Sequence, residues 1–184
     1  MRITRCLAAI FLVFLVSAAP AVAADDPRLD RLFERLKTAP DAETAQPIEA
    51  EIWYRWIVAG GPAAESLIQI GMEAMQRGDM RGALAIFDAV TAQNPGFAEG
   101  WNKRATVLFL MGALDASAAD CAKVLALEPR HFGALSGLGL IRTRQERWDD
   151  AIKAFDQALA VHPNLSGAKH NVEMLRKQRG DKPI

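Results

Sequence analysis

The sequence predicts an all-α protein in which antiparallel helix pairs stack into a short right-handed solenoid. The first observation is that Pro95, Pro129 and Pro163 follow one another at intervals of 34 residues. The second is that the residues before each proline recur at the same steps. The aligned quartets are Ala83, Phe87, Val90 and Pro95; Ser117, Cys121, Val124 and Pro129; and Ala151, Phe155, Ala158 and Pro163. Steps of four and three return to one face of a helix, so each unit holds two helices joined by a short turn.

Each position of a quartet has a physical role. The small first residue lets the second helix of a pair approach the first helix closely. The next residue, which is Phe87, Cys121 or Phe155, fills the gap between neighbouring repeats. The proline ends the helix because its ring has no N–H to continue the hydrogen bonds. The first helices align in the same phase: Leu67, Ile70 and Gly71; Trp101, Arg104 and Ala105; Leu135, Leu138 and Gly139; with turn residues Gly78, Gly112 and Glu146.

From Trp101 to Pro129, and more closely from 137 to 163, the sequence resembles the tetratricopeptide repeat family. The resemblance covers three repeats, 64–97, 98–131 and 132–165. Cys121, Arg104 and Glu146 stand where the family usually has an aromatic residue, a large aliphatic residue and a turn glycine. The resemblance implies a non-enzymatic scaffold that binds a protein or peptide on its concave side. By the same analogy, exported members often serve envelope assembly, secretion or cytochrome maturation.

Residues 1–24 have the three-part pattern of a secretory signal peptide. Two arginines begin it, the apolar run Leu7–Val16 continues it, and small residues with signal-peptidase spacing end it. We expect cleavage after Ala23 or Ala24 and a periplasmic protein; an uncleaved anchor is the alternative. Cys121 would then be the single cysteine of the mature chain, so its stability would come from packing and not from an internal disulfide.

Helices are also predicted on both sides of the repeats. Residues 25–61 contain two, at 26–38 and from about 41 or 44 to 59. Trp53 lies 34 residues before Phe87, so we interpret this pair as a degenerate fourth repeat that caps the N-terminal end. An unrelated helical hairpin is the alternative. Residues 166–179 continue the repeat phase and are expected to cover the last apolar face as a capping helix, followed by a disordered tail at 180–184.

Few residues point to chemistry. The sequence has no nucleophile elbow, metalloprotease, Walker or dinucleotide-binding motif, so we expect no enzyme, no cofactor and no metal site. His131, His162 and His170 are isolated from one another and are expected to face solvent or to cap helices. Cys121 is expected to be inert core, because it occupies a buried helix position without a basic neighbour.

Three methionines define an alternative function. Met72 and Met75 share a helix face and Met80 opens the next helix, which suggests a Met-based metal-handling protein or an enzyme accessory factor. Since no fourth soft ligand lies nearby, packing or a plastic contact surface is the preferred interpretation.

Charge excludes some partners. The chain carries 22 basic and 22 acidic residues, so no basic surplus indicates nucleic acid or an anionic membrane as a partner. We also expect no stable membrane insertion after signal cleavage.

The concave side is the predicted binding surface, because the first helices of stacked pairs line it. The apolar side chains of Ile68, Met72, Phe109 and Leu140 are not needed by the predicted core, and small and amide residues lie beside them. Such a strip suits an extended or helical peptide, here a client of the cell envelope. The predicted groove residues are Glu65, Ile68, Met72, Met75, Asn102, Thr106, Phe109, Gly133, Ser136, Gly137, Leu140 and Arg144.

Two other occupants of this surface remain possible in the prediction: the N-terminal helices, or a second copy in a structural homo-oligomer. Some members of the family that the chain resembles bind acidic tails of heat-shock chaperones through a basic clamp. We reject that mode here, because Gly133 and Gly137 stand where cations would be needed and Asn102 is one residue out of register.

Overall fold

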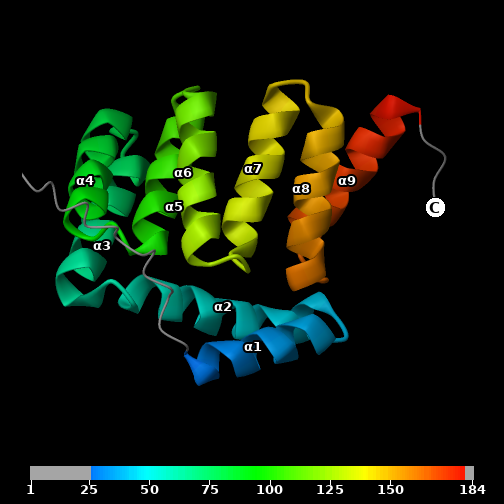
Figure 1. The fold of residues 1–184 in the computed structure, drawn as a ribbon, viewed down its shortest axis with the longest axis horizontal. Coiled ribbons are helices and arrows are strands. Elements are labelled where there is room, and N and C mark those ends of the chain that lie inside the picture. The colour runs from blue at the N-terminus through cyan, green and yellow to red at the C-terminus, as the bar shows by residue number, and fades with distance from the viewer. Residues whose placement is uncertain (1–25, 181–184) are drawn as a thin grey trace, which may run out of the picture.

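Six consecutive helices form three antiparallel pairs in the register that the proline spacing predicts. The computed structural model describes residues 26–180, so the predicted signal peptide and residues 181–184 of the predicted tail lie outside the described residues. The helices are α1 (Pro27–Thr38), α2 (Ala42–Val58), α3 (Gly61–Gln76), α4 (Met80–Gln93), α5 (Ala98–Leu110), α6 (Leu114–Leu127), α7 (Phe132–Arg144), α8 (Trp148–Val161) and α9 (Ser166–Arg179). Figure 1 shows α3 to α8 standing side by side in a row, which confirms the all-α solenoid.

The turns inside the three pairs share one backbone conformation. Gly78 and Gly112 have φ angles of 79° and 80°, which glycine adopts at no steric cost because it lacks a Cβ. Glu146 takes the same place in the third pair with φ 58°. A side chain in this left-handed region costs about 1–2 kcal/mol, so the third pair keeps the turn at the expense of strain.

In the first and third pairs, a phenylalanine ring on the second helix packs directly against a glycine on the first helix. A Cβ built on Gly71 of α3 would lie 2.5 Å from the ring of Phe87 on α4. A Cβ on Gly139 of α7 would lie 2.6 Å from the ring of Phe155 on α8. Both phenylalanines are fully buried, so the close helix crossing that the sequence predicts is set by these ring-on-glycine contacts.

Arg104 joins neighbouring pairs. Its Nε and Nη2 each donate to the Asp120 carboxylate on α6 at 2.7 Å, and its Nη1 donates to Asp88 on α4 at 3.0 Å. Asp120 is buried, and a buried carboxylate is costly unless it is paired in this way. The arginine that departs from the family pattern therefore replaces an apolar contact with an ionic one between repeats.

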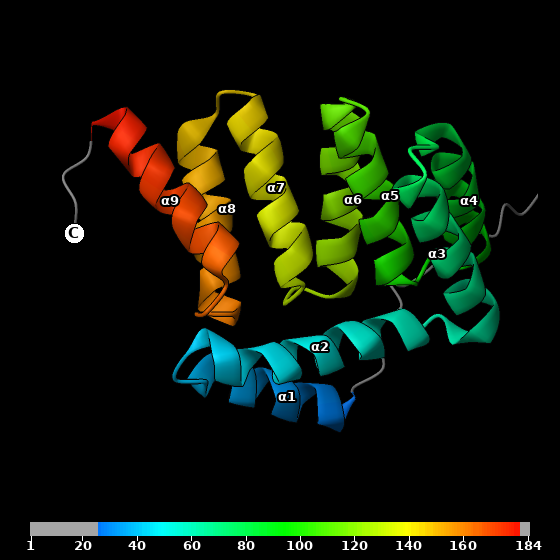
Figure 2. The same cartoon turned by 180° about the vertical axis from the view of Figure 1, so that it is seen from behind.

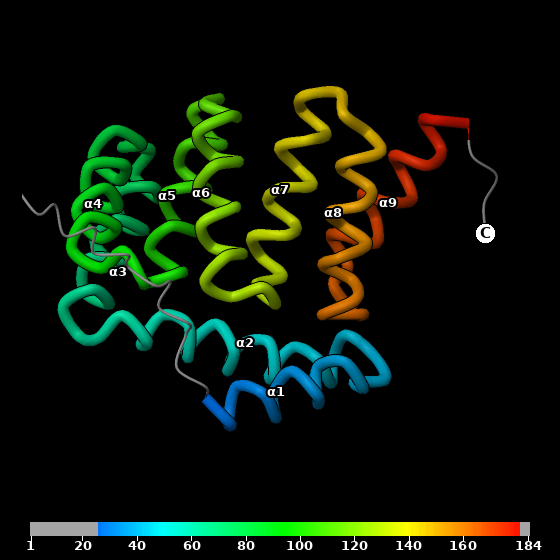
Figure 3. Tube along the Cα trace, in the orientation of Figure 1, coloured from blue at the N-terminus to red at the C-terminus, as the bar shows by residue number. Residues whose placement is uncertain are grey.

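The N-terminal helical pair does not stack on the repeats. Figures 1 and 2 show α1 and α2 lying across the ends of the repeat helices, with α2 between α1 and the row. Gly61, at φ 79°, begins α3, and the tube in Figure 3 follows the chain as it changes direction there. Leu36, Ile52 and Trp56 share one buried cluster with Phe132 of α7. The prediction of a degenerate fourth repeat that caps the N-terminal end is therefore wrong.

This arrangement explains a second error. The repeat phase aligns Ile70 with Leu138, which the sequence pattern places with the inward first-helix positions, but the Ile70 side chain is 45% exposed. Its equivalent in the next repeat, Arg104, reaches back to Asp88 of the preceding pair. No pair precedes α3 in the stack, because α1 and α2 lie across the repeats, so no preceding pair covers Ile70. Leu135, at the aligned position in the third pair that corresponds to Leu67, is buried.

The C-terminal helix covers the last repeat as predicted. Ala168, Val172 and Leu175 of α9 pack into one cluster with Ala151 and Phe155 of α8. Within residues 26–180, no helix has the length and apolar character needed to cross a membrane.

The strained turn gives a stability prediction. Replacing Glu146 with glycine should raise the free energy of unfolding by about 0.5–1 kcal/mol, because relief of the left-handed strain exceeds the extra entropy that glycine loses on folding. Urea unfolding followed by circular dichroism measures this change. Gly112→Glu, in the matched turn of the second pair, should lower the stability; a rise there, or no gain from Glu146→Gly, contradicts the assignment.

Candidate protein-binding groove

A cleft opens between α5, α6 and α7 on the side predicted to bind a client. Its volume is about 200 Å³. Seven of the predicted groove residues line it, namely Asn102, Thr106, Phe109, Gly133, Ser136, Gly137 and Leu140. Four lining residues were not among the predicted groove residues: Ala105, Ser117, Cys121 and Ile141. The quartet alignment could have indicated Cys121, because it is a small residue where the neighbouring repeats have Phe87 and Phe155. It could also have indicated Ser117, which holds the small position where the two helices of the pair cross closely.

The cleft exists because the middle repeat lacks the ring of its neighbours. Where the other pairs match glycine with phenylalanine, this pair matches Ala105 with Cys121. Gly137 adds no side chain on the facing helix, and a Cβ built there would lie 3.7 Å from the Cys121 Sγ. Burial raises the pKa of the Cys121 thiol to about 12. The thiol therefore stays protonated and forms part of the cleft floor, as expected for inert core.

Polar groups on the cleft wall are mostly paired. Asn102 Nδ2 donates to Glu99 Oε2 at 2.9 Å, and the Thr106 hydroxyl donates to the Asn102 carbonyl at 3.0 Å. The Ser117 hydroxyl donates to the Ala105 carbonyl at 2.7 Å. The buried Ser136 hydroxyl has no partner among the described residues.

An arginine and an aromatic ring form the rim. The guanidinium carbon of Arg144 lies 4.0 Å from the Phe109 ring centroid, and Arg144 Nη1 donates to the Phe109 carbonyl at 3.0 Å. Leu140 is 38% exposed beside them. Arg144 thus belongs to the groove through Phe109, although it does not line the cleft itself.

The first repeat contributes less than predicted. Ile68 is 1% exposed and packs in the core with Phe87, so its assignment to the groove is wrong. The inward face of α3 carries Ala64, Ile68, Gly71 and Ala74, so Ile68 takes the buried position, and Ile70, two residues later, does not. Met75 is also packed against this core, whereas Met72 and Glu65 are exposed on α3.

Met80 packs against the same cluster as Met75. Thioethers held in apolar packing are gap fillers, which is the preferred interpretation from the sequence.

Helix α2 closes one end of the groove. A Cβ on Gly133 would lie 2.5 Å from the Trp53 ring, so the tryptophan fills the space where a side chain would project. Lys103 Nζ lies 5.5 Å from the centroid of the Trp53 ring. The predicted alternative that N-terminal helices cover the concave side therefore holds at this end alone.

A buried polar network lies where α2 meets the repeats. Glu99 and His131 are both fully buried, with His131 Nε2 3.1 Å from Glu99 Oε2. His131 Nδ1 accepts from the Ala134 N–H, so the proton of the neutral ring is on Nε2 and is donated to Glu99. Lys103 Nζ lies 2.8 Å from the other oxygen. Burial raises the pKa of Glu99, but the hydrogen bond from His131 and the charge of Lys103 oppose it, and the net shift is downward.

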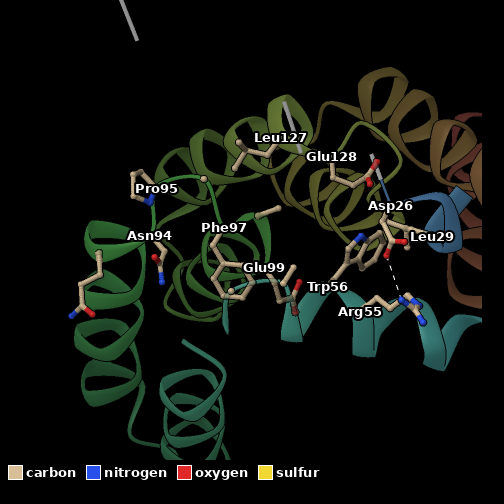
Figure 4. A pocket seen from close by; sticks show the side chains of 15 residues that line it. Asp26, Leu29, Arg55, Trp56, Asn94, Pro95, Phe97, Glu99, Leu127 and Glu128 are labelled. Atoms are coloured by element: carbon tan, nitrogen blue, oxygen red, sulfur yellow. Dashed lines mark hydrogen bonds and ion pairs between the residues drawn. The ribbon is translucent and has the colours of Figure 1, made fainter. Parts of the chain in front are cut away.

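The indole of Trp56 stacks on the His131 ring, with centroids 3.9 Å apart and planes 8° apart. A pocket of about 450 Å³ remains at this junction. Figure 4 shows Arg55 and Trp56 of α2 on one side of it, with Phe97 and Glu128 opposite. The pocket marks the seam between the N-terminal pair and the repeat turns.

A second histidine attaches the other end of the pair. His162 is buried, and its Nε2 donates to Glu49 Oε2 of α2 over 3.2 Å. The expectation that the histidines face solvent or cap helices is therefore correct for the helix cap by His131 and for the exposed His170. His162 stands at the C-cap of α8, but it does not face solvent, because it is buried against a helix more than a hundred residues earlier.

Comparison with known proteins defines the class of the molecule. The tetratricopeptide repeat family matches residues 68–130 and 132–165. A TPR repeat-containing protein of Rhizobium etli is 35% identical over 164 residues, which are 89% of this chain and 80% of that protein. The chain belongs to the tetratricopeptide repeat family.

Solved structures share the fold. The first TPR of Spaghetti (RPAP3), bound to the HSP90 peptide SRMEEVD, is 19% identical, covers 63% of this chain and 92% of that chain, and has a TM-score of 0.61. The Yersinia enterocolitica secretion chaperone SycD, in complex with a peptide of the translocator YopD, is 11% identical over 64% of this chain and 95% of that one, with a TM-score of 0.60. MamA protein is 16% identical over 83% and 81%, with a TM-score of 0.59.

The contact between Glu49 and His162 predicts a pH dependence. The hydrogen bond from His162 holds the pKa of Glu49 below its ordinary value of 4.5, against the opposing effect of burial. A lowered folded-state pKa stabilises the fold above the unfolded pKa, and this stabilisation is lost as the pH falls through the folded pKa. Glu49→Gln should therefore be less stable than wild type at pH 7, and the difference should shrink below pH 4.5.

Urea unfolding between pH 3 and pH 7 measures this difference. Glu43→Gln, an exposed position on the same helix, is the matched control and should follow wild type. A difference between wild type and Glu49→Gln that does not change with pH would show that the ionised carboxylate of Glu49 is not its source.

Proposed function

We propose that the protein is a non-enzymatic adaptor of the periplasm that captures a segment of a cell-envelope protein in the groove between α5 and α7. The fold is that of a protein–protein interaction scaffold. The observation that carries the proposal is the open cleft at Ala105 and Cys121, in a stack whose neighbouring pairs are filled by a phenylalanine ring.

The cleft suits one apolar side chain of an extended client. Its floor is formed by Ala105, Cys121 and Ile141, and Phe109 and Leu140 flank it. Binding energy in such sites is concentrated in a side chain that enters a desolvated pocket.

The groove is not suited to an acidic tail. Solved relatives include RPAP3 domains with the HSP90 peptide SRMEEVD and the HSP70 peptide SGPTIEEVD. Here Lys103 is committed to the buried Glu99, and Gly133 and Gly137 carry no charge. We therefore assign an apolar anchor to the client and not a carboxylate cluster.

The periplasmic location rests on the sequence of residues 1–24, with its arginines, apolar run and signal-peptidase spacing. N-terminal sequencing of the protein from fractionated cells tests it. A chain that begins at Ala24 or Asp25 in the periplasmic fraction supports the proposal, and an unprocessed chain in the cytoplasm contradicts it.

A double substitution can fill the cleft without changing the fold. Ala105→Gly together with Cys121→Phe recreates the glycine–phenylalanine pair of the first and third repeats, so the ring should enter the slot that is now open. We expect stability within about 1.5 kcal/mol of wild type and at least a tenfold loss of client capture. Capture is measured by photocrosslinking in the intact envelope from a probe at Thr106.

The matched control is Ile70→Ala, which removes an exposed apolar side chain outside the groove and should leave capture unchanged. Capture that survives the filled cleft, in a folded variant, excludes this cleft as the binding site.

The rim gives a second test. Phe109→Ala with Leu140→Asp should leave the helical signal of circular dichroism intact and abolish crosslinking, because it removes apolar contact and adds a charge that would have to be buried. Light scattering on the same samples separates client binding from self-association. A dimer that this variant dissociates would identify a second copy as the occupant of the groove.

A further inference from the structure

Helix α1 carries a row of three arginines on one face. Arg28, Arg31 and Arg35 are spaced by three and four residues, which places them in line along a helix. All three are exposed. At about 1.5 Å per residue the row extends for about 10 Å along the helix axis.

These arginines form no ion pair with an acidic residue among residues 26–180. The acidic residues Asp26 and Asp30, which are close to them in the sequence, pair with other arginines. Asp26 binds Arg55 of α2 at 3.3 Å, and Asp30 binds Arg130 at 2.7 Å. The helix therefore turns these two carboxylates toward the rest of the protein and leaves the row of guanidinium groups outward. Glu34 is the remaining acidic residue of α1, and it is exposed.

The row borders an open cleft between α1 and α2 of about 580 Å³. Leu32 and Ile48 are buried in its floor. Glu51 and Arg55 also line it, but they form an ion pair with each other at 2.8 Å. The charge that the cleft offers to a partner is thus the positive charge of the three arginines.

Such a row has a cost for the isolated protein. Like charges three and four residues apart on a helix repel each other and destabilise it. The chain as a whole has equal numbers of basic and acidic residues, so the row is a local concentration and not a consequence of composition. A partner with several negative charges along a surface would relieve the repulsion.

We propose that the arginine row of α1 binds the phosphate headgroups of an anionic membrane surface. Guanidinium groups form paired hydrogen bonds with phosphate oxygens, and a linear row can meet several headgroups at once. The three arginines are spaced along one helix face and are all exposed, so they can contact a flat anionic surface together.

The placement of α1 leaves the groove free. Figures 1 and 2 show α1 on the outer side of α2. It contacts the repeats through the Asp30–Arg130 ion pair and through the packing of Leu36 with Phe132, and none of these residues lines the groove. The contact would be peripheral and electrostatic, and it does not depend on which client the groove captures. Binding of this kind is screened by salt.

Vesicle flotation tests the proposal. The protein is produced from its full sequence, so that any processing takes place in the producing cell, and is mixed with vesicles of phosphatidylcholine alone or with 30% phosphatidylglycerol added, a fraction of about the order found in anionic membranes. We expect at least tenfold more binding to the anionic vesicles at low salt, and loss of that preference in 0.5 M sodium chloride, where the Debye length falls to about 4 Å. Arg28→Ala, Arg31→Ala and Arg35→Ala together should remove the preference.

The matched control is the triple variant Lys123→Ala, Lys153→Ala and Lys169→Ala, which removes the same charge from exposed positions on α6, α8 and α9. It should keep the preference, and lysine at all three arginine positions should restore most of it. Three results overturn the proposal: no preference for anionic vesicles, equal loss in both alanine triples, or tighter binding of soluble polyglutamate than of the vesicles. Circular dichroism of each variant confirms that it is folded.

Discussion

The fold depends on the nesting of a side chain into the space left by a missing one. In the first and third pairs, a phenylalanine ring occupies the place where a Cβ on Gly71 or Gly139 would be. Because interiors are packed to near crystal density, the sizes of the two residues are coupled. The middle pair changes both, with Ala105 opposite Cys121. The helices stay paired, but the smaller residues leave a cleft on the concave side.

The same constraint therefore links stability and binding. A helix pair whose interior is filled by a phenylalanine ring has no room for a side chain of a client. The middle pair, which lacks that ring, has a cleft that such a side chain can enter. The middle repeat restores the lost contact by other means, since Arg104 joins three helices through Asp88 and Asp120. The middle repeat therefore combines the ion pairs of Arg104 with the cleft at Ala105 and Cys121.

The N-terminal pair gives the solenoid a second layer. Its Trp53 and Trp56 pack on His131 at an inter-repeat turn, beside the fully buried Glu99 of α5, which contacts His131, Asn102 and Lys103. Buried charges persist where their hydrogen bonds are complete. This layer closes one end of the groove at Gly133 and presents the arginines of α1 on its outer side, so the two proposed surfaces are separated by α2.

The sequence by itself determined the three helix pairs, their turns and the close crossings, because each of these depends on residues within one 34-residue unit. It also indicated seven of the residues that line the cleft. Tertiary structure alone decided the direction of α1 and α2, and with it the exposure of Ile70 and the burial of His162. Those outcomes depend on contacts across 113 residues, as between Glu49 and His162, and no periodicity within a repeat encodes which distant surface a helix will meet.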